Sequence, residues 1–242
     1  MPNLNTNSNG YTLGFLAIMV VVVGGALALV SSALKPTIDA NILLDTRTKI
    51  MKSLLALSEE DENSKLTANF VNGEYENNVK AYLVDYNGDV AEEKIPATYD
   101  FRKEMKDASK PLENKLFPVY EYTSEGQKVY ALQMLGLGLW DEINGYIALK
   151  EDKKTIKGVA FDHKGETPGL GAELVKYKFR KQFFNQSLFD TNGNYDFVVY
   201  KAGKLPANGK GVDGLAGATL TTNGIDAMVK HTAEIYKNFL NK

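Results

Sequence analysis

The chain has 242 residues, of which 44% are hydrophobic and 24% are charged, proportions that are ordinary for one or two folded domains. Its net charge of -2 offers no positive surface to nucleic acid, and we exclude that partner class. Cysteine is absent and histidine occurs twice, which excludes cysteine-ligated iron–sulfur clusters, haem attached through cysteine and multi-histidine metal sites. Any redox chemistry therefore requires an organic cofactor, and we predict no metal site.

An apolar segment without charged residues occupies residues 11–34. As a helix it would span about 36 Å, enough to cross the hydrocarbon core of a bilayer. Ala26-Leu27-Ala28 resembles a signal-peptide cleavage site, but residues 1–10 lack the Lys or Arg with which a signal peptide begins. We therefore predict an N-terminal tail over residues 1–10 and a retained, single-pass transmembrane helix over residues 11–34.

The charges near this span are all C-terminal to it, at Lys35, Arg47, Lys49 and Lys52. The positive-inside rule would place the rest of the chain in the cytoplasm, but long domains cross the membrane largely regardless of charge. The charges alone leave the side of the membrane open.

Residues 35–65 are predicted to form a juxtamembrane helix and linker. The helix follows Pro36 and runs to about Leu57, and the acidic stretch Ser58–Lys65 is expected to be a solvated link. Residues 66–242 are predicted to form the main folded domain.

Strands separated by turns dominate this predicted domain. Tyr82, Val84 and Tyr86 alternate onto one face before Asn87-Gly88, a strong hairpin signal. Further strands are expected over 128–135, on both sides of the polar turn 151–154, and from Tyr195. A final helix is expected after Asn223, where apolar and small residues recur at three- and four-residue spacing: Ile225, Met228, Val229, Thr232, Ile235, Tyr236 and Phe239. The predicted fold class is α+β with a mixed or antiparallel sheet.

Familiar catalytic motifs are missing. The chain has no G-x-S-x-G elbow, and neither His163 nor His231 lies in a motif that would make it a general base. Gly203–Lys210 fails the spacing of a phosphate-binding P-loop, and "GLGLW" at 136–140 lacks the third glycine of a dinucleotide fingerprint. We predict no catalytic residue.

Two glycine-rich loops are the remaining candidates. In "GETPGLG" (165–171), Pro168-Gly169 favours a type II turn whose free backbone N–H groups could contact a planar ring. In "GVDGLAGATLTTNG" (211–224), small residues leave the Thr219 hydroxyl accessible, and 221–223 could cap the following helix. Taken singly, each loop is more simply a turn, because turns greatly outnumber ligand loops.

Taken together, the loops resemble a known family. "DGLAGATLT" from Asp213 is similar to the flavinylation signature D-G-x-S/T-G-A-T of FMN-binding domains, and "ETPGLG" to the family's other hallmark. With the N-terminal anchor, "GLGLW" and "GYIAL", the chain resembles the family of C subunits of Na⁺-translocating NADH:quinone reductases. The G subunit of the RNF ferredoxin:NAD complex is one alternative. A membrane-tethered binding or assembly domain without flavin is another. Ala216 departs from the signature, which usually has Ser or Thr there.

The resemblance implies that a separate flavin transferase attaches FMN covalently, through its phosphate, to Thr219. It implies a cofactor site comprising Thr219, Glu166, Thr167, Gly169, Leu170, Gly171, Asp213, Gly217, Ala218 and Leu220, with Leu139 and Trp140 as candidate packing partners of the ring. For a sole tryptophan, a place in the core is the alternative. The implied function is an electron relay with the other membrane and peripheral subunits of a Na⁺-pumping oxidoreductase. The implied location is the bacterial inner membrane, with the flavin domain on the periplasmic side.

Overall fold

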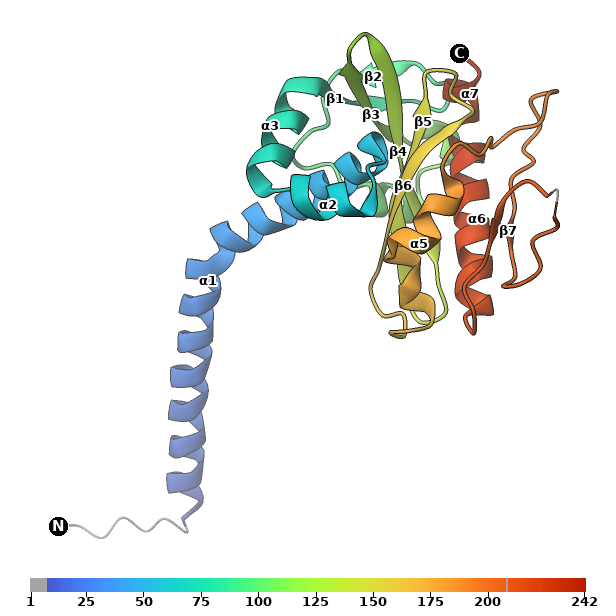
Figure 1. The fold of residues 1–242 in the computed structure, drawn as a ribbon. Helices are drawn as coiled ribbons and strands as arrows, with labels where there is room; N and C mark the ends of the chain where they lie inside the picture. The colour runs from blue at the N-terminus through green and yellow to red at the C-terminus, as the bar shows by residue number, and fades with distance from the viewer. Residues whose placement is uncertain (1–7, 208) are drawn as a thin grey trace. The chain divides into compact units, whose positions relative to one another are not determined.

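The computed structural model describes residues 8–207 and 209–242 (Figure 1), so most of the predicted tail lies outside the described residues. Helix α1 (Asn9–Leu55) contains the predicted span and is the one helix in this part of the chain that is long and apolar enough to cross a membrane. We expected a separate helix after Pro36, but α1 continues through that residue. Residues 1–45 and 46–242 form two compact units.

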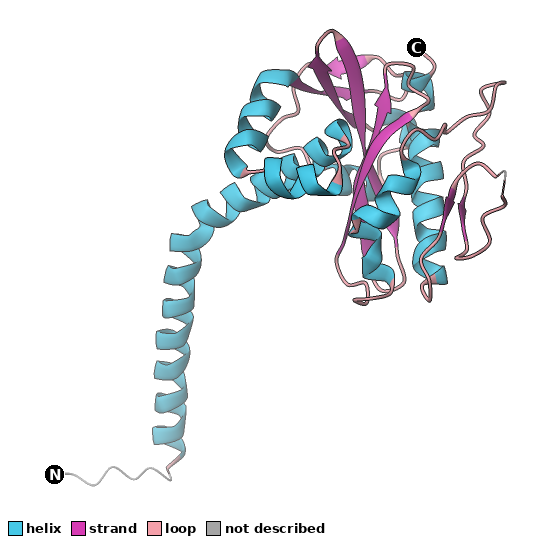
Figure 2. Cartoon of the chain, viewed as in Figure 1, coloured by secondary structure: helices cyan, strands magenta, loops and turns pink. Residues whose placement is uncertain are grey.

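An antiparallel sheet forms the centre of the second unit (Figure 2). Its strands are β1 (Val79–Val84), β2 (Val90–Glu92), β3 (Phe117–Ser124), β4 (Gln127–Leu137), β5 (Glu142–Lys150) and β6 (Ile156–His163), in the order β2-β1-β3-β4-β5-β6. The predicted hairpin is confirmed, and Gly88 has a φ of 78° in its turn. The strand expected from Tyr195 is shorter than predicted: β7 (Val199–Tyr200) pairs in parallel with β8 (Val212–Asp213). The α+β fold class is confirmed.

The remaining helices surround this sheet. They are α2 (Glu59–Lys65), α3 (Ala68–Asn78), α4 (Phe101–Lys106), α5 (Tyr177–Arg180), α6 (Thr219–Ile235) and α7 (Lys237–Leu240), with 3-10 turns η1 (Leu112–Asn114), η2 (Gly171–Val175) and η3 (Lys181–Phe183). Helix α6 packs on β4 (Figure 1). A Cβ atom added at Gly224 would lie 2.1 Å from the Leu137 carbonyl oxygen, so this glycine allows the helix to touch the strand's backbone.

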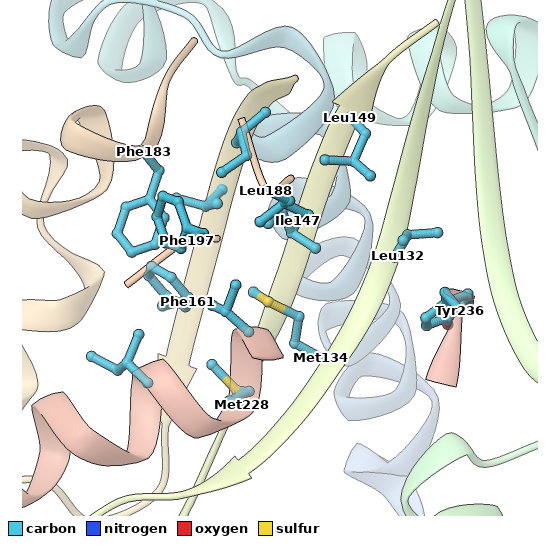
Figure 3. Close-up of a cluster of buried hydrophobic side chains, with 14 of the residues drawn as sticks. Leu132, Met134, Ile147, Leu149, Phe161, Phe183, Leu188, Phe197, Met228 and Tyr236 are labelled. Carbon is cyan, nitrogen blue, oxygen red and sulfur yellow. The ribbon is translucent and has the colours of Figure 1, made fainter. Parts of the chain in front are cut away.

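The hydrophobic core lies between the sheet and α6. Met134, Ile147, Phe161, Met228 and Tyr236 belong to it (Figure 3). All seven residues of the predicted helical stripe are buried, but the predicted single helix is divided: α6 ends at Ile235, and Phe239 lies in α7. The start of the helix was predicted too late, because α6 begins at Thr219 rather than after Asn223.

The end of α1 and helix α2 are part of the second unit. Ile50, Met51 and Leu54 of α1 are buried. Most of the stretch Ser58–Lys65 is exposed, as expected, but it forms α2 rather than a link. Glu62 is the buried exception, and its carboxylate binds the Arg180 guanidinium, with Oε2 to Nη2 at 2.6 Å. Sequence reasoning missed this pair because its members are 118 residues apart.

Candidate functional site

Glu166 joins three segments that are distant in the sequence. Its Oε1 accepts hydrogen bonds from the backbone N–H groups of Leu139 (2.8 Å) and Trp140 (3.2 Å). Its Oε2 accepts a hydrogen bond from the Thr221 hydroxyl at 2.5 Å. The Glu166 residue is 5% exposed. The loops 136–140 and 165–171 and the first turn of α6 therefore meet at one buried carboxylate.

Glycines make room for this carboxylate. A Cβ atom added at Gly138 would lie 2.3 Å from Glu166 Oε1, and one added at Gly171 would lie 2.1 Å from Glu166 Oε2. Gly169 has a φ of 75°, as the predicted type II turn requires of its glycine. The Thr167 carbonyl accepts hydrogen bonds from the N–H groups of Leu170 and Ala172, both at 3.1 Å. The turn is thus closed by its own backbone.

The three threonines of the second loop differ in exposure. Thr221 and Thr222 are 1% and 0% exposed, whereas Thr219 is exposed. The Thr222 hydroxyl accepts a hydrogen bond from the Leu215 N–H at 3.0 Å, and the Thr221 hydroxyl donates to Glu166. The predicted role of Thr221 and Thr222 as helix caps is wrong, because Ala218 is the N-cap residue, and both hydroxyls instead bond groups outside the helix.

Thr219 is the first residue of α6, where backbone N–H groups point away from the helix without intrahelical partners. Ala218 provides no side-chain cap for these groups. Gly217, with a φ of 71°, and the exposed Ala216 precede them. An anion next to the Thr219 hydroxyl would therefore meet free donors and the positive end of a 17-residue helix.

The segments that meet near this position carry exposed apolar side chains. Leu139, Trp140, Leu170 and Leu220 have exposed fractions of 45%, 69%, 42% and 59%. A core position for Trp140 is therefore wrong. A Cβ atom added at Gly217 would lie 2.8 Å from Leu170 Cδ2, which brings the two loops into direct contact. Exposed apolar side chains of this kind could contact a flat apolar ligand.

Asp213 links the second loop to two other segments by hydrogen bonds. Its carboxylate accepts a hydrogen bond from the Gly203 N–H at 2.7 Å. The side-chain amide of Gln182 bonds both its backbone N–H, at 3.1 Å, and its carbonyl oxygen, at 3.3 Å. Ala216, where the resembling signature has Ser or Thr, is exposed, so no buried polar group depends on a hydroxyl there.

Exposed cationic side chains gather around the buried carboxylate of Glu142, which follows the 136–140 loop, and sequence reasoning missed this cluster. The Glu142 carboxylate is 2% exposed and binds Arg102 and Lys106, with Lys164 Nζ at 3.8 Å. Burial acts to raise the pKa of Glu142, but the hydrogen bond from Lys106 and the charge of Arg102 outweigh it, so its pKa lies below the usual value. The sequence signal that could have indicated this cluster is Glu142 itself, a charged residue at the start of an otherwise largely apolar strand.

The fold and the two loops define a flavin-binding domain, since the family model described as "FMN-binding domain" matches residues 138–234. The C subunit of the Na(+)-translocating NADH-quinone reductase of Pseudomonas aeruginosa is 31% identical, covering 93% of this chain and 91% of that protein. The corresponding protein of Haemophilus ducreyi is 30% identical, covering 96% and 92%. The chain belongs to the family of C subunits of the Na⁺-translocating NADH-quinone reductases.

Two solved structures have the same fold as this chain. The crystal structure of the C subunit from Parabacteroides distasonis superimposes with a TM-score of 0.73 at 32% identity, covering 86% of this chain and 98% of that one. That of Shewanella oneidensis NqrC superimposes with a TM-score of 0.63 at 24% identity, covering 81% and 97%, and shows the same fold. The chain is thus an FMN-binding subunit of a Na⁺-translocating oxidoreductase complex. The names of these relatives favour this assignment over the RNF alternative.

Proposed function

We propose that the chain carries FMN covalently on Thr219 through a phosphoester and relays electrons within a Na⁺-translocating NADH:quinone reductase. The observation that carries the proposal is the difference among the three threonines. Thr221 and Thr222 are buried and hydrogen-bonded inside the protein, whereas the Thr219 hydroxyl is exposed at a helix start amid glycine and alanine.

The attachment step uses the accessibility of this hydroxyl. With FAD as the donor and a separate Mg²⁺-dependent flavin transferase as the catalyst, Thr219 Oγ1 forms a bond to the phosphorus of the FMN half. The pyrophosphate bond breaks, AMP leaves, and the hydroxyl proton is lost. Gly217 and Ala218 keep the approach open, because neither has a bulky side chain. The free N–H groups at the start of α6 favour the phosphate charge.

The residues around Thr219 fit the isoalloxazine ring as well as the phosphate. Leu139, Trp140, Leu170 and Leu220 provide apolar contact, and the turn of Thr167, Gly169 and Gly171 provides the wall next to it. When bound, FMN supplies reversible electron transfer, and the protein sets its potential by packing and charge. A covalent link keeps the carrier in place between reduction and reoxidation.

The electron donors and acceptors of this relay are other subunits of the complex. We propose that α1 anchors the chain in the bacterial inner membrane and that the flavin domain lies on the periplasmic side, as the family resemblance implies. Protease added to spheroplasts would then cleave the domain, and a chain that stays intact until lysis would place the domain in the cytoplasm.

Intact mass spectrometry of the chain co-expressed with a flavin transferase tests the attachment. We expect a mass increase equal to FMN less one water, and ultraviolet-excited fluorescence of the band after SDS treatment. Thr219→Val should abolish both signals, because it keeps the shape and removes the hydroxyl. Thr219→Ser should retain them.

Thr222→Ser is the control within the same loop and should remain labelled. Wild-type protein that stays dark and unmodified would support the alternative of a tethered binding domain without flavin. Labelling that persists in Thr219→Val would place the linkage on another residue.

A further inference from the structure

We propose that Glu166 is a positioning residue that touches no flavin but fixes the surface on which the ring lies. The inference rests on the proposed function for its consequence and on the geometry of the protein alone for its cause. A carboxylate in a ligand loop would ordinarily be assigned to the ligand. Here both oxygens are already bound, Oε1 by the N–H groups of Leu139 and Trp140 and Oε2 by the Thr221 hydroxyl.

The hydrogen bonds of the two Glu166 oxygens hold two different parts of the proposed site. The Oε1 side fixes the backbone of the two residues whose exposed side chains line the proposed ring surface. The Oε2 side fixes α6 two residues after Thr219, the proposed point of attachment. Glu166 therefore connects the Leu139–Trp140 backbone, under the proposed ring surface, to the helix turn that carries the proposed attachment residue Thr219.

Few other polar bonds hold the Leu139–Trp140 segment. The Gly138 N–H donates to the Asp141 carbonyl at 2.8 Å, which closes the loop locally, and the Lys164 N–H donates to the Glu142 carbonyl at 3.2 Å. The side chains of Leu139 and Trp140 are 45% and 69% exposed, so core packing holds them weakly. Without the carboxylate, their N–H groups would open to water.

Four variants distinguish the effect of the Glu166 hydrogen bonds from the effect of its negative charge and from a general loss of stability. Thr221→Val removes one hydroxyl and keeps the side-chain shape. Thr232→Val is its matched control, because Thr232 is also a buried threonine of α6 but its hydroxyl bonds only the Met228 carbonyl of the same helix, at 2.8 Å. Glu166→Ala removes both links. Glu166→Gln retains both, with its carbonyl accepting from the two N–H groups and its amide donating to Thr221.

The first measurement needs no flavin. In a full-length Thr219→Val background, amide hydrogen exchange at Leu139 and Trp140 should become about tenfold faster or more with Thr221→Val and with Glu166→Ala. Thr232→Val and Glu166→Gln should leave it unchanged, and the Gly138 amide should not respond in any variant. Equal exchange in Thr221→Val and Thr232→Val would overturn the proposal.

The second measurement uses the labelled chain with Thr219 intact. Thr221→Val should lower the fluorescence anisotropy of the attached flavin toward that of free FMN and shift its midpoint potential, while Thr232→Val should match wild type in both. Glu166→Gln should match wild type in anisotropy. Loss of anisotropy in Glu166→Gln would show that the charge acts rather than the connection, which contradicts the proposal. If wild-type protein takes no flavin, the proposed function fails and the exchange measurement still decides the role of Glu166.

Discussion

Gly171 shows how the lack of a Cβ atom at one residue makes room for the site. An added Cβ would lie 2.1 Å from Glu166 Oε2 and 2.7 Å from Thr221 Oγ1, the two atoms of the Glu166–Thr221 hydrogen bond. Both residues are buried. Space, rather than backbone conformation, therefore requires glycine here.

We expect Gly171→Ala to destabilise the folded chain by about 1–3 kcal/mol, because the carboxylate or the hydroxyl must shift. Thermal unfolding followed by circular dichroism measures the effect. Gly73→Ala is the control, since no atom lies within 4 Å of a Cβ there and the position is inside α3. That substitution should stabilise the chain by about 0.5–1 kcal/mol. Equal effects of the two variants would contradict the steric argument.

The residues of the site were accessible to sequence reasoning to different degrees. Thr219 could be selected by resemblance, and its exposure is consistent with that choice. The partners of Glu166 could not, because Leu139 and Thr221 lie 27 and 55 residues away and no local pattern reports such contacts. For the same reason sequence reasoning offered only a ligand contact for Glu166, not these partners within the protein.

Among the elements, α2 shows how a short helix is held by one buried ion pair. Glu62 and Arg180 have side chains 6% and 4% exposed, and Arg180 also donates to the Val159 and Val175 carbonyls. The guanidinium thus makes four hydrogen bonds, and removal of its counterion would leave a buried charge.

We expect Glu62→Ala to destabilise the chain by about 3–5 kcal/mol, measured by chemical denaturation in detergent. Asp61→Ala on the same helix is the control. The Asp61–Lys65 pair is exposed, with side chains 39% and 57% accessible, so only a small change is expected. A loss in Glu62→Ala no larger than in Asp61→Ala would show that α2 is held by other contacts.

The Glu142 cluster makes the junction of β5 with the 136–140 loop sensitive to acid. Because the pKa of Glu142 is lower in the folded chain than in the unfolded one, the ion pairs stabilise the fold above the unfolded pKa of about 4.3. This stabilisation is lost as the pH falls through the folded pKa. Glu142→Gln should therefore be less stable than wild type at neutral pH, with a difference in thermal midpoint that shrinks below about pH 4.3. A difference that is constant with pH would contradict this prediction.

For the whole molecule, the last part of α1 belongs to the flavin-binding unit. Ile50, Met51 and Leu54 are at most 1% exposed, and Arg47 Nη1 lies 2.8 Å from Glu76 Oε1. The compact unit begins at Thr46, and the predicted domain start at residue 66 stays a prediction. Periodicity predicted the fold class and the core face of α6, but strand order and the burial of Ile50, Met51 and Leu54 depend on contacts between distant segments.

We expect a shortened chain that begins at Lys35 to be soluble and to unfold cooperatively. A chain that begins at Ser58 should aggregate or unfold, because each lost core side chain contributes about 1.5–3 kcal/mol and total stabilities are about 5–15 kcal/mol. Sedimentation and circular dichroism distinguish the two. Equal stability of both chains would show that residues 46–55 are dispensable.

The position of α6 in the chain has a consequence for maturation. Proteins leave the ribosome from the N-terminus, so the sheet and the 165–171 loop emerge before residues 219–235. The contact between Glu166 and Thr221 can close only after α6 has docked, and the proposed acceptor Thr219 begins that same helix. Attachment of a flavin to Thr219 would therefore follow the synthesis of the whole sheet.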